Sequence, residues 1–109
     1  MFCRRNDDGY RQALPGVAMK TLVFGDKMLL VEFRLLAGHV LPRHAHAQEQ
    51  TGYLVSGAIR LLVGEETVDL APGDAWSIPA NVEHAATIIA DSVAVEVFSP
   101  VRQDYLADA

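Results

Sequence analysis

Two histidines separated by one residue are the side chains of this sequence best suited to bind a metal. On an extended strand, His44 and His46 point to the same face, roughly 7 Å apart along the backbone. From one face, two imidazoles can converge on a single ion at about 2.0–2.1 Å per bond. His84 supplies a third imidazole from a distant segment. This spacing predicts a metal site that includes the three histidines.

Short β-rich runs, separated by turn residues, must bring these histidines together. In the second run, Val31, Phe33 and Leu35 share one face, and Glu32 and Arg34 share the other. No long helical period interrupts the runs, so the pattern predicts an all-β sandwich or barrel. The expected strands are residues 17–24, 28–36, 44–55, 58–63, 66–70, 75–78, 84–89 and 92–98.

The two ends of the chain differ from this pattern. Residues 1–15 are polar and are expected to form a loop-like N-terminal segment. Ser99 and Pro100 resemble an N-cap followed by the first helical residue, which predicts a short C-terminal helix over residues 99–107. With 109 residues and no linker or internal repeat, the chain is expected to be one domain, residues 1–109.

Composition narrows the partners and the cellular setting. The formal net charge of −5 argues against a nucleic-acid partner, which requires clustered lysines and arginines. It permits a small anionic ligand, because a local metal or arginine can outweigh the overall charge. Cys3 is the single cysteine, so no disulfide forms within the chain, which favours a reducing compartment. We expect a cytoplasmic protein with no signal peptide and no membrane-spanning stretch.

Glycine, glutamine and proline residues around the histidines complete two spaced motifs. The first is Gly-x5-His-x-His-x3-Gln-x6-Gly, and the second is Gly-x5-Pro-x4-His. They occupy Gly38, His44, His46, Gln50, Gly57, Gly73, Pro79 and His84. Both motifs resemble those of the cupin superfamily, in which a glutamate usually stands at the glutamine position. The resemblance implies a double-stranded β-helix, the jelly-roll barrel, with the site inside the barrel.

A narrower resemblance covers most of the chain. The segments HAHAQEQTGYLVSG, GDAWSIPANVEH and EVFSPVRQDYL are similar to the small KdgF-type cupins of pectin degradation. This family converts 4,5-unsaturated uronate monosaccharides, which pectate and alginate lyases release, into linear 5-keto uronates. The resemblance implies a metal held by three histidines and one glutamine. The matching positions are His44, His46, Gln50 and His84.

The same resemblance places further functional positions near the end of the chain. It implies catalytic roles for Glu96 and Arg102 and an aromatic wall at Phe98, although aspartate is typical where Glu96 stands. The residues themselves agree with these roles. A lone carboxylate on an apolar strand needs a partner or a function, and an arginine can bind a substrate carboxylate with two parallel hydrogen bonds.

Glu49 is the rival of Gln50 for the fourth ligand position. Counting back seven residues from Gly57 gives Gln50, and its neighbour would point to the opposite face of a strand. Three imidazoles and one amide are neutral, so a bound ion would keep its full positive charge and attract a carboxylate or an enolate. Such a ligand set permits zinc, nickel, iron, manganese or cobalt.

Other side chains have both a structural and a functional interpretation. Trp76 and Tyr53, like Phe98, either fill the core or form the wall of a substrate site. Arg60 is a weaker candidate for binding the substrate, and His39 is expected to be a loop residue outside the motifs.

The working hypothesis is a metal-dependent enzyme that opens the ring of unsaturated uronates, small anionic sugars. A cupin dioxygenase is an alternative, although many such sites keep a carboxylate ligand and this one offers an amide. A non-enzymatic cupin that binds a small molecule is another alternative. An exposed sheet edge is usually paired or covered, so a homodimer is expected.

Overall fold

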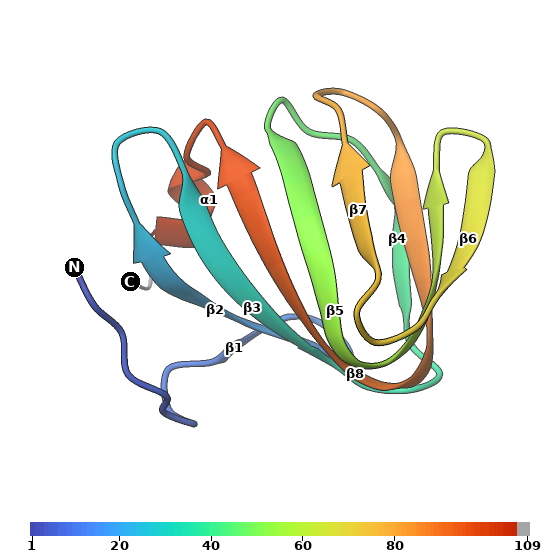
Figure 1. Cartoon of the computed structure of the whole chain (residues 1–109), viewed down its shortest axis with the longest axis horizontal. Helices are drawn as coiled ribbons and strands as arrows, with labels where there is room; N and C mark the ends of the chain where they lie inside the picture. Colours follow the sequence, from blue (N-terminus) through green and yellow to red (C-terminus); the bar gives the residue numbers. More distant parts are fainter. Residues whose placement is uncertain (107–109) are drawn as a thin grey trace.

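Eight strands in two facing sheets make up most of the computed structural model, which describes residues 1–106 (Figure 1). The strands are β1 (Arg11–Leu14), β2 (Val17–Phe24), β3 (Leu29–Leu35), β4 (Val40–His44), β5 (Glu49–Val63), β6 (Glu66–Leu70), β7 (Ala75–Ile78) and β8 (His84–Ser99). One short helix, α1 (Gln103–Leu106), follows β8. The predicted all-β jelly-roll barrel with a short C-terminal helix is confirmed.

Two long strands, β5 and β8, belong to both sheets. The first part of β8 pairs with β4 and its second part with β3, whereas the first part of β5 pairs with β7 and its second part with β6. One sheet therefore has the order β1-β2-β3-β8-β5-β7 and the other β4-β8-β5-β6, with every pair antiparallel. Because the same two strands run through both sheets, the sheets enclose one interior.

The shared strands bend at Gly57, where φ is +95°. A Cβ atom there would lie less than 3.0 Å from Ser92 Oγ and from the carbonyl oxygen of Asp91. Ser92 Oγ also accepts a hydrogen bond from the amide of Ala58 at 3.1 Å, which ties the two bends together. Only glycine suits this position, because other residues avoid this φ and the space is filled.

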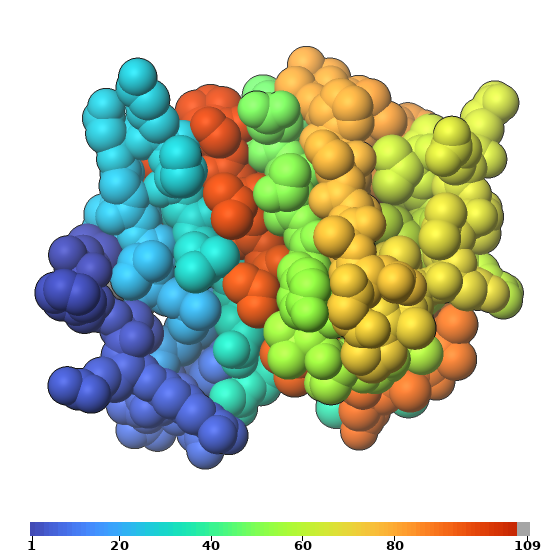
Figure 2. Space-filling model, in the orientation of Figure 1, coloured from blue at the N-terminus to red at the C-terminus, as the bar shows by residue number. Residues whose placement is uncertain are grey.

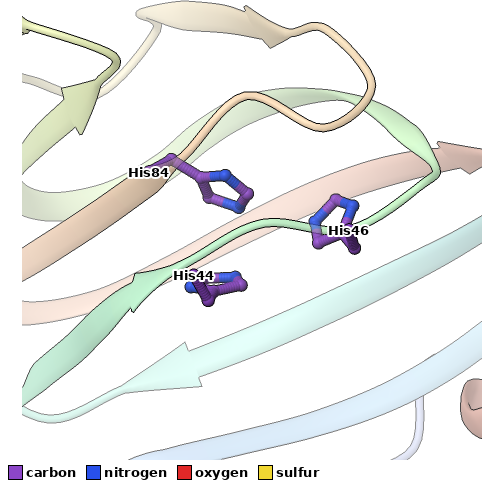
Figure 3. Close-up of side chains that lie close together, drawn as sticks. All are labelled: His44, His46 and His84. Atoms are coloured by element: carbon purple, nitrogen blue, oxygen red, sulfur yellow. The ribbon is translucent and has the colours of Figure 1, made fainter.

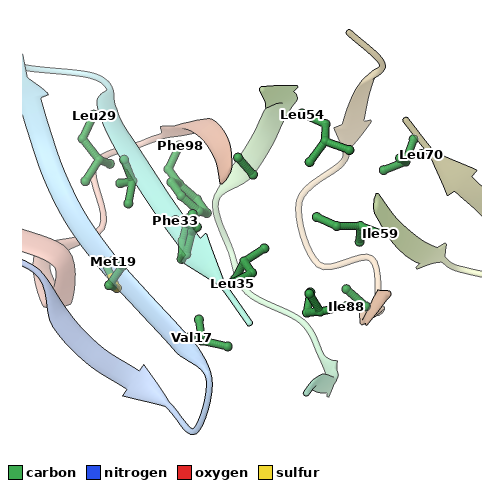
Figure 4. Close-up of a cluster of buried hydrophobic side chains, with 13 residues drawn as sticks. Val17, Met19, Leu29, Phe33, Leu35, Leu54, Ile59, Leu70, Ile88 and Phe98 are labelled. Atoms are coloured by element: carbon green, nitrogen blue, oxygen red, sulfur yellow. The ribbon is translucent and has the colours of Figure 1, made fainter. Parts of the chain in front are cut away.

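Alternation along β3 fills the interior between the sheets. Leu29, Val31, Phe33 and Leu35 are buried, and the residues between them are partly exposed, as the sequence pattern predicted. The same core continues across both sheets (Figure 4). Each fully buried large apolar side chain stabilises the fold by about 1.5–3 kcal/mol. The other core members are Val17, Met19, Leu54, Ile59, Leu70, Ala86, Ile88, Ala94 and Phe98.

Several segments differ from the sequence-based expectation. His46 lies in the connection between β4 and β5 rather than on a strand, so the two histidines do not share one extended strand. The polar N-terminal segment contains β1. The expected strands 84–89 and 92–98 form the single bent strand β8.

The C-terminal helix begins later than predicted. Ser99 still pairs with Glu49 in the sheet, and its hydroxyl donates to the carbonyl of Lys27 at 2.7 Å instead of capping a helix. The helix therefore starts at Gln103, and residue 107, the last of the expected range, lies outside the described residues. No helix within residues 1–106 is long and apolar enough to cross a membrane.

Candidate metal centre and cavity

Three histidines meet inside the barrel (Figure 3). His44 is the last residue of β4, and it pairs in register with His84, the first residue of β8. The ligand atoms that these two rings and His46 offer all lie within 4.8 Å of one another. Two nitrogens that bind one ion at about 2.0–2.1 Å lie at most about 4.2 Å apart, so small ring movements would suffice. The three histidines that the motifs singled out are therefore brought together.

Backbone carbonyls fix how each imidazole is presented. Nδ1 of each ring lies against the carbonyl oxygen of a residue two positions away, at 2.8 Å for His44 and His46 and at 2.9 Å for His84. A carbonyl only accepts, so Nδ1 carries the proton and Nε2 keeps its lone pair. Burial lowers the pKa of His46 and of His84, which favours neutral rings. Neutral rings oriented in this way are the form that binds metals.

Gln50, rather than Glu49, faces the histidines. Gln50 is 5% exposed, whereas Glu49 is exposed on the outer face of β5. The Oε1 atom of Gln50 lies 2.7 Å from His46 Nε2, and its Nε2 donates to Glu96 Oε1 at 2.8 Å. Because His46 Nε2 and Gln50 Oε1 are then both acceptors, their short separation suits a cation shared between them. The donor set fits a divalent transition metal.

Glu96, on β8, contacts the side of the Gln50 amide that faces away from His46. Its Oε1 accepts hydrogen bonds from Gln50 and from the indole N–H of Trp76, each at 2.8 Å. Burial raises the pKa of Glu96 to about 7, although both hydrogen bonds and the charge of Arg102 act in the opposite direction. A carboxyl group with a pKa near neutrality can both accept and donate a proton at pH 7.

Arg102, the residue just before α1, lies over two aromatic rings. Its guanidinium carbon is 3.9 Å from the ring centroid of Tyr105 and 5.3 Å from that of Phe98. Nη1 donates to Tyr105 Oη at 2.9 Å, and Nη2 donates to Asp104 Oδ2 at 3.0 Å. These bonds leave one further N–H on each terminal nitrogen for a ligand.

Tyr105 is the cavity residue that sequence interpretation missed. Its ring packs edge-on against Phe98 and Phe33, with centroids 5.3 Å and 6.4 Å apart. Its position three residues after Arg102, on the same face of a helical turn, is the signal that would have found it.

One cavity connects these polar groups. The site residues described above all line it: His44, His46, Gln50, Trp76, His84, Glu96, Phe98, Arg102 and Tyr105. The rest of its wall is apolar and includes Phe33, Leu35, Leu41, Ile59, Leu61, Leu70 and Ile78. A candidate cation site, a carboxyl group and a guanidinium therefore face one largely apolar interior, which suits a small anionic ligand.

Tyr53 and Arg60 lie outside this cavity, so the structure does not bring these two predicted residues to the site. Tyr53 is 51% exposed on the outer face of β5. Arg60 is also exposed, and its guanidinium pairs with Asp69 on β6 at 2.7 Å and 3.1 Å. Strict alternation would turn Arg60 inward, but register shifts around Gly57 place Ile59 inside instead.

Known proteins share both the sequence pattern and the fold. A family model described as a cupin domain matches residues 31–100. An uncharacterized protein of Streptomyces coelicolor is 36% identical over 69 residues, which cover 62% of this chain and 66% of that protein, just under two thirds of its length.

Solved structures resemble the whole barrel. KdgF from Halomonas sp. superposes with a TM-score of 0.90 at 29% identity, covering 95% of this chain and 96% of the other. An RmlC-like cupin from Shewanella frigidimarina superposes with a TM-score of 0.84 at 26% identity, covering 88% and 86% of the two chains. The likeness therefore extends over the strands that carry the candidate site.

Proposed function

Because this chain belongs to the cupin family, as its spaced motifs predicted, we propose that it is a metal-dependent enzyme that opens the ring of 4,5-unsaturated uronate monosaccharides. The observation that carries this proposal is that the histidine cluster, Glu96 and Arg102 face one cavity. An unsaturated uronate offers a matching set of groups: oxygen donors, an exchangeable proton and a carboxylate. The likeness to KdgF from Halomonas sp. supports the KdgF-type reaction that the sequence resemblance implied.

Arg102 is the residue best placed to bind the carboxylate of the sugar. Its two remaining terminal N–H groups match the two oxygens of a carboxylate, and such paired bonds are stronger than neutral ones. Tyr105 and Asp104 hold the guanidinium in place, so little freedom is lost when a ligand binds. The ring of Phe98 forms the neighbouring wall of the cavity.

Glu96 is the residue best placed to move the proton. The C1 hydroxyl of the hemiacetal loses a proton, the C1–O5 bond breaks, and its electron pair passes to the ring oxygen as an enolate. Addition of a proton at C4 then gives the ketone, so the reaction is an isomerisation without an oxidant. Glu96 Oε1 is occupied by two hydrogen bonds, so Oε2 would take the first proton and return it at C4.

His44, His46, His84 and Gln50 would hold the metal. A bound divalent metal supplies Lewis-acid stabilisation of the negative charge that develops beside the substrate carboxylate. All four of these ligands are uncharged. The bound ion would therefore keep its full positive charge. Zinc, nickel, iron, manganese and cobalt are all compatible with these donors.

Conversion of unsaturated galacturonate by the zinc- or nickel-loaded protein tests the proposal. The ultraviolet absorbance of the conjugated double bond disappears on protonation of C4, and NMR identifies the linear keto product. We expect Glu96→Gln to lower kcat by about 10²–10⁴-fold and Arg102→Met to raise KM. Glu49→Gln, a matched change on the outer face of β5, leaves both unchanged. Absorbance that decays no faster with the loaded wild-type protein than without it refutes the proposal.

The outer face of the sheet β3-β8-β5 supports a homodimer, which we also propose. On this face, shown in Figure 2, Val93, Val95 and Val97 are only partly buried, and Tyr53 and Val55 are 51% and 47% exposed. A solvated face of an antiparallel sheet normally carries polar residues, but the outward positions 93, 95 and 97 of β8 are all valine. Light scattering is expected to show a dimer that Val95→Glu dissociates. A wild-type monomer at micromolar concentration would contradict the proposal.

A further inference from the structure

We infer that Glu96 and Trp76 orient the amide of Gln50 toward the histidines, and that both are positioning residues of the metal site. The inference rests on the proposed metal site, because Gln50 is its fourth donor. Gln50 is the link between two groups: its carbonyl oxygen lies 2.7 Å from His46 Nε2, and its NH₂ group lies 2.8 Å from Glu96 Oε1.

Only one orientation of the amide donates a hydrogen bond to Glu96 Oε1, and that orientation places the carbonyl oxygen beside His46 Nε2. If it were turned by 180°, its carbonyl oxygen would face Glu96 Oε1, and two acceptors would then lie in contact. Gln50 is only 5% exposed, so water is poorly placed to compensate for the lost hydrogen bond. As long as Glu96 accepts from Gln50, the carbonyl oxygen is the atom presented to the metal.

Trp76 holds the carboxylate of Glu96 in place by a hydrogen bond, which depends on a row of paired residues across three strands. Gly52 on β5 pairs with Trp76 on β7 and with Glu96 on β8, and all three share the face that points inward. A Cβ atom on Gly52 would lie less than 3.0 Å from three atoms of the indole ring. The missing side chain therefore lets the ring reach across β5 and donate to Glu96 Oε1 at 2.8 Å.

This arrangement gives a physical reason for glutamine at position 50. A glutamate at position 50 would have no N–H to donate. One of its carboxylate oxygens would instead lie against Glu96 Oε1, which is also an acceptor. Gln50 and Glu96 are thus a complementary pair, in which the amide donates on one side and offers an oxygen ligand on the other. Groups that hold a metal ligand in this way typically change metal affinity by about 10- to 100-fold when they are removed.

Zinc affinities measured by competition with a chelator, on the full chain, test this inference without any substrate. We expect Glu96→Met, which removes the acceptor, to weaken zinc binding by about 10- to 100-fold. Glu96→Gln keeps an acceptor for the N–H of Gln50, so its zinc affinity is expected to stay within about threefold of the wild-type value. Trp76→Phe removes the indole N–H together with part of the ring, keeps an aromatic side chain, and is expected to weaken binding by about 2- to 10-fold. Glu49→Met is the matched control on the outer face of β5, and its affinity is expected to stay at the wild-type value.

The possible failures of this inference and of the proposed function are distinguishable. A wild-type protein that binds no zinc overturns the metal site itself. Equal losses in Glu96→Gln and Glu96→Met would show that the charge of Glu96 matters rather than its hydrogen bond, and would overturn the inference alone. If Glu96→Met does not fold, as judged by thermal unfolding without metal, Trp76→Phe decides: an unchanged zinc affinity overturns the inference.

Discussion

Replacing Gly52 by alanine perturbs the candidate site without touching a proposed ligand. A Cβ atom at this position would lie well under 3.0 Å from Cε2, Cζ2 and Nε1 of Trp76. These atoms belong to a rigid ring, so the ring has to move, and its hydrogen bond to Glu96 is lost. Overpacking costs about 1–3 kcal/mol, and the lost hydrogen bond adds about 0.5–1.5 kcal/mol. Alanine regains about 0.5–1 kcal/mol relative to glycine in a strand.

The free energy of unfolding is therefore expected to fall by about 0.5–4 kcal/mol, which lowers Tm by roughly 2 °C or more. Thermal unfolding of the metal-free protein, followed by circular dichroism, measures this change. Gly25→Ala is the matched control, because no atom lies within 4 Å of a Cβ atom there. Adding Trp76→Phe removes the three clashing atoms and should recover part of the loss. Equal Tm values for the Gly52 and Gly25 variants would refute the reasoning.

The same geometry predicts how three other properties respond. His84→Ala is expected to abolish tight zinc binding in a chelator competition, whereas His39→Ala, which lies outside the cavity, leaves it unchanged. The fluorescence of Trp76, the single tryptophan, is expected to change on adding zinc, because its N–H belongs to the hydrogen-bond chain that leads to the site. Constant emission from a sample that binds zinc would contradict this. Arg60→Met is expected to leave both Tm and KM close to their wild-type values, because its ion pair with Asp69 is exposed. A raised KM would instead show that Arg60 contributes to binding the substrate.

Local sequence patterns predicted the interior of the barrel well where strands are regular. Alternation placed Gln50 inside and Glu49 outside at the start of β5, and the structure agrees. The same rule placed Val31, Phe33 and Leu35 in the core. These predictions depend only on the two-residue repeat of a strand, which the sequence shows directly.

The same rule was wrong where the backbone departs from regularity. Arg60 follows the bend at Gly57, where register shifts reverse which residues face inward. The sequence shows the glycine but not the number of shifted residues, because that number depends on how β8 bends beside it. Tyr105 was missed for a different reason. Its spacing from Arg102 indicates a shared helical face, but the sequence does not show that this turn packs against Phe98.

The contact between Trp76 and Glu96 was also beyond the reach of sequence patterns. Trp76 was expected to fill the core or to form a cavity wall, and nothing near it in sequence indicates a hydrogen bond to β8. The contact depends on two strand registers that meet at Gly52. Registers of this kind are set by the assembled sheet rather than by any one segment.

The pairing of β5 with β8 also sets the order in which the barrel can assemble. Its paired residues are 21 positions apart at one end, residues 63 and 84, and 50 apart at the other, residues 49 and 99. Longer loops cost more chain entropy to close, so the end near His84 is expected to form first. Contacts over such separations are typical of proteins that fold in milliseconds to seconds. Gln50 and Glu96 lie near the late end, so a complete metal site exists only after the barrel has closed.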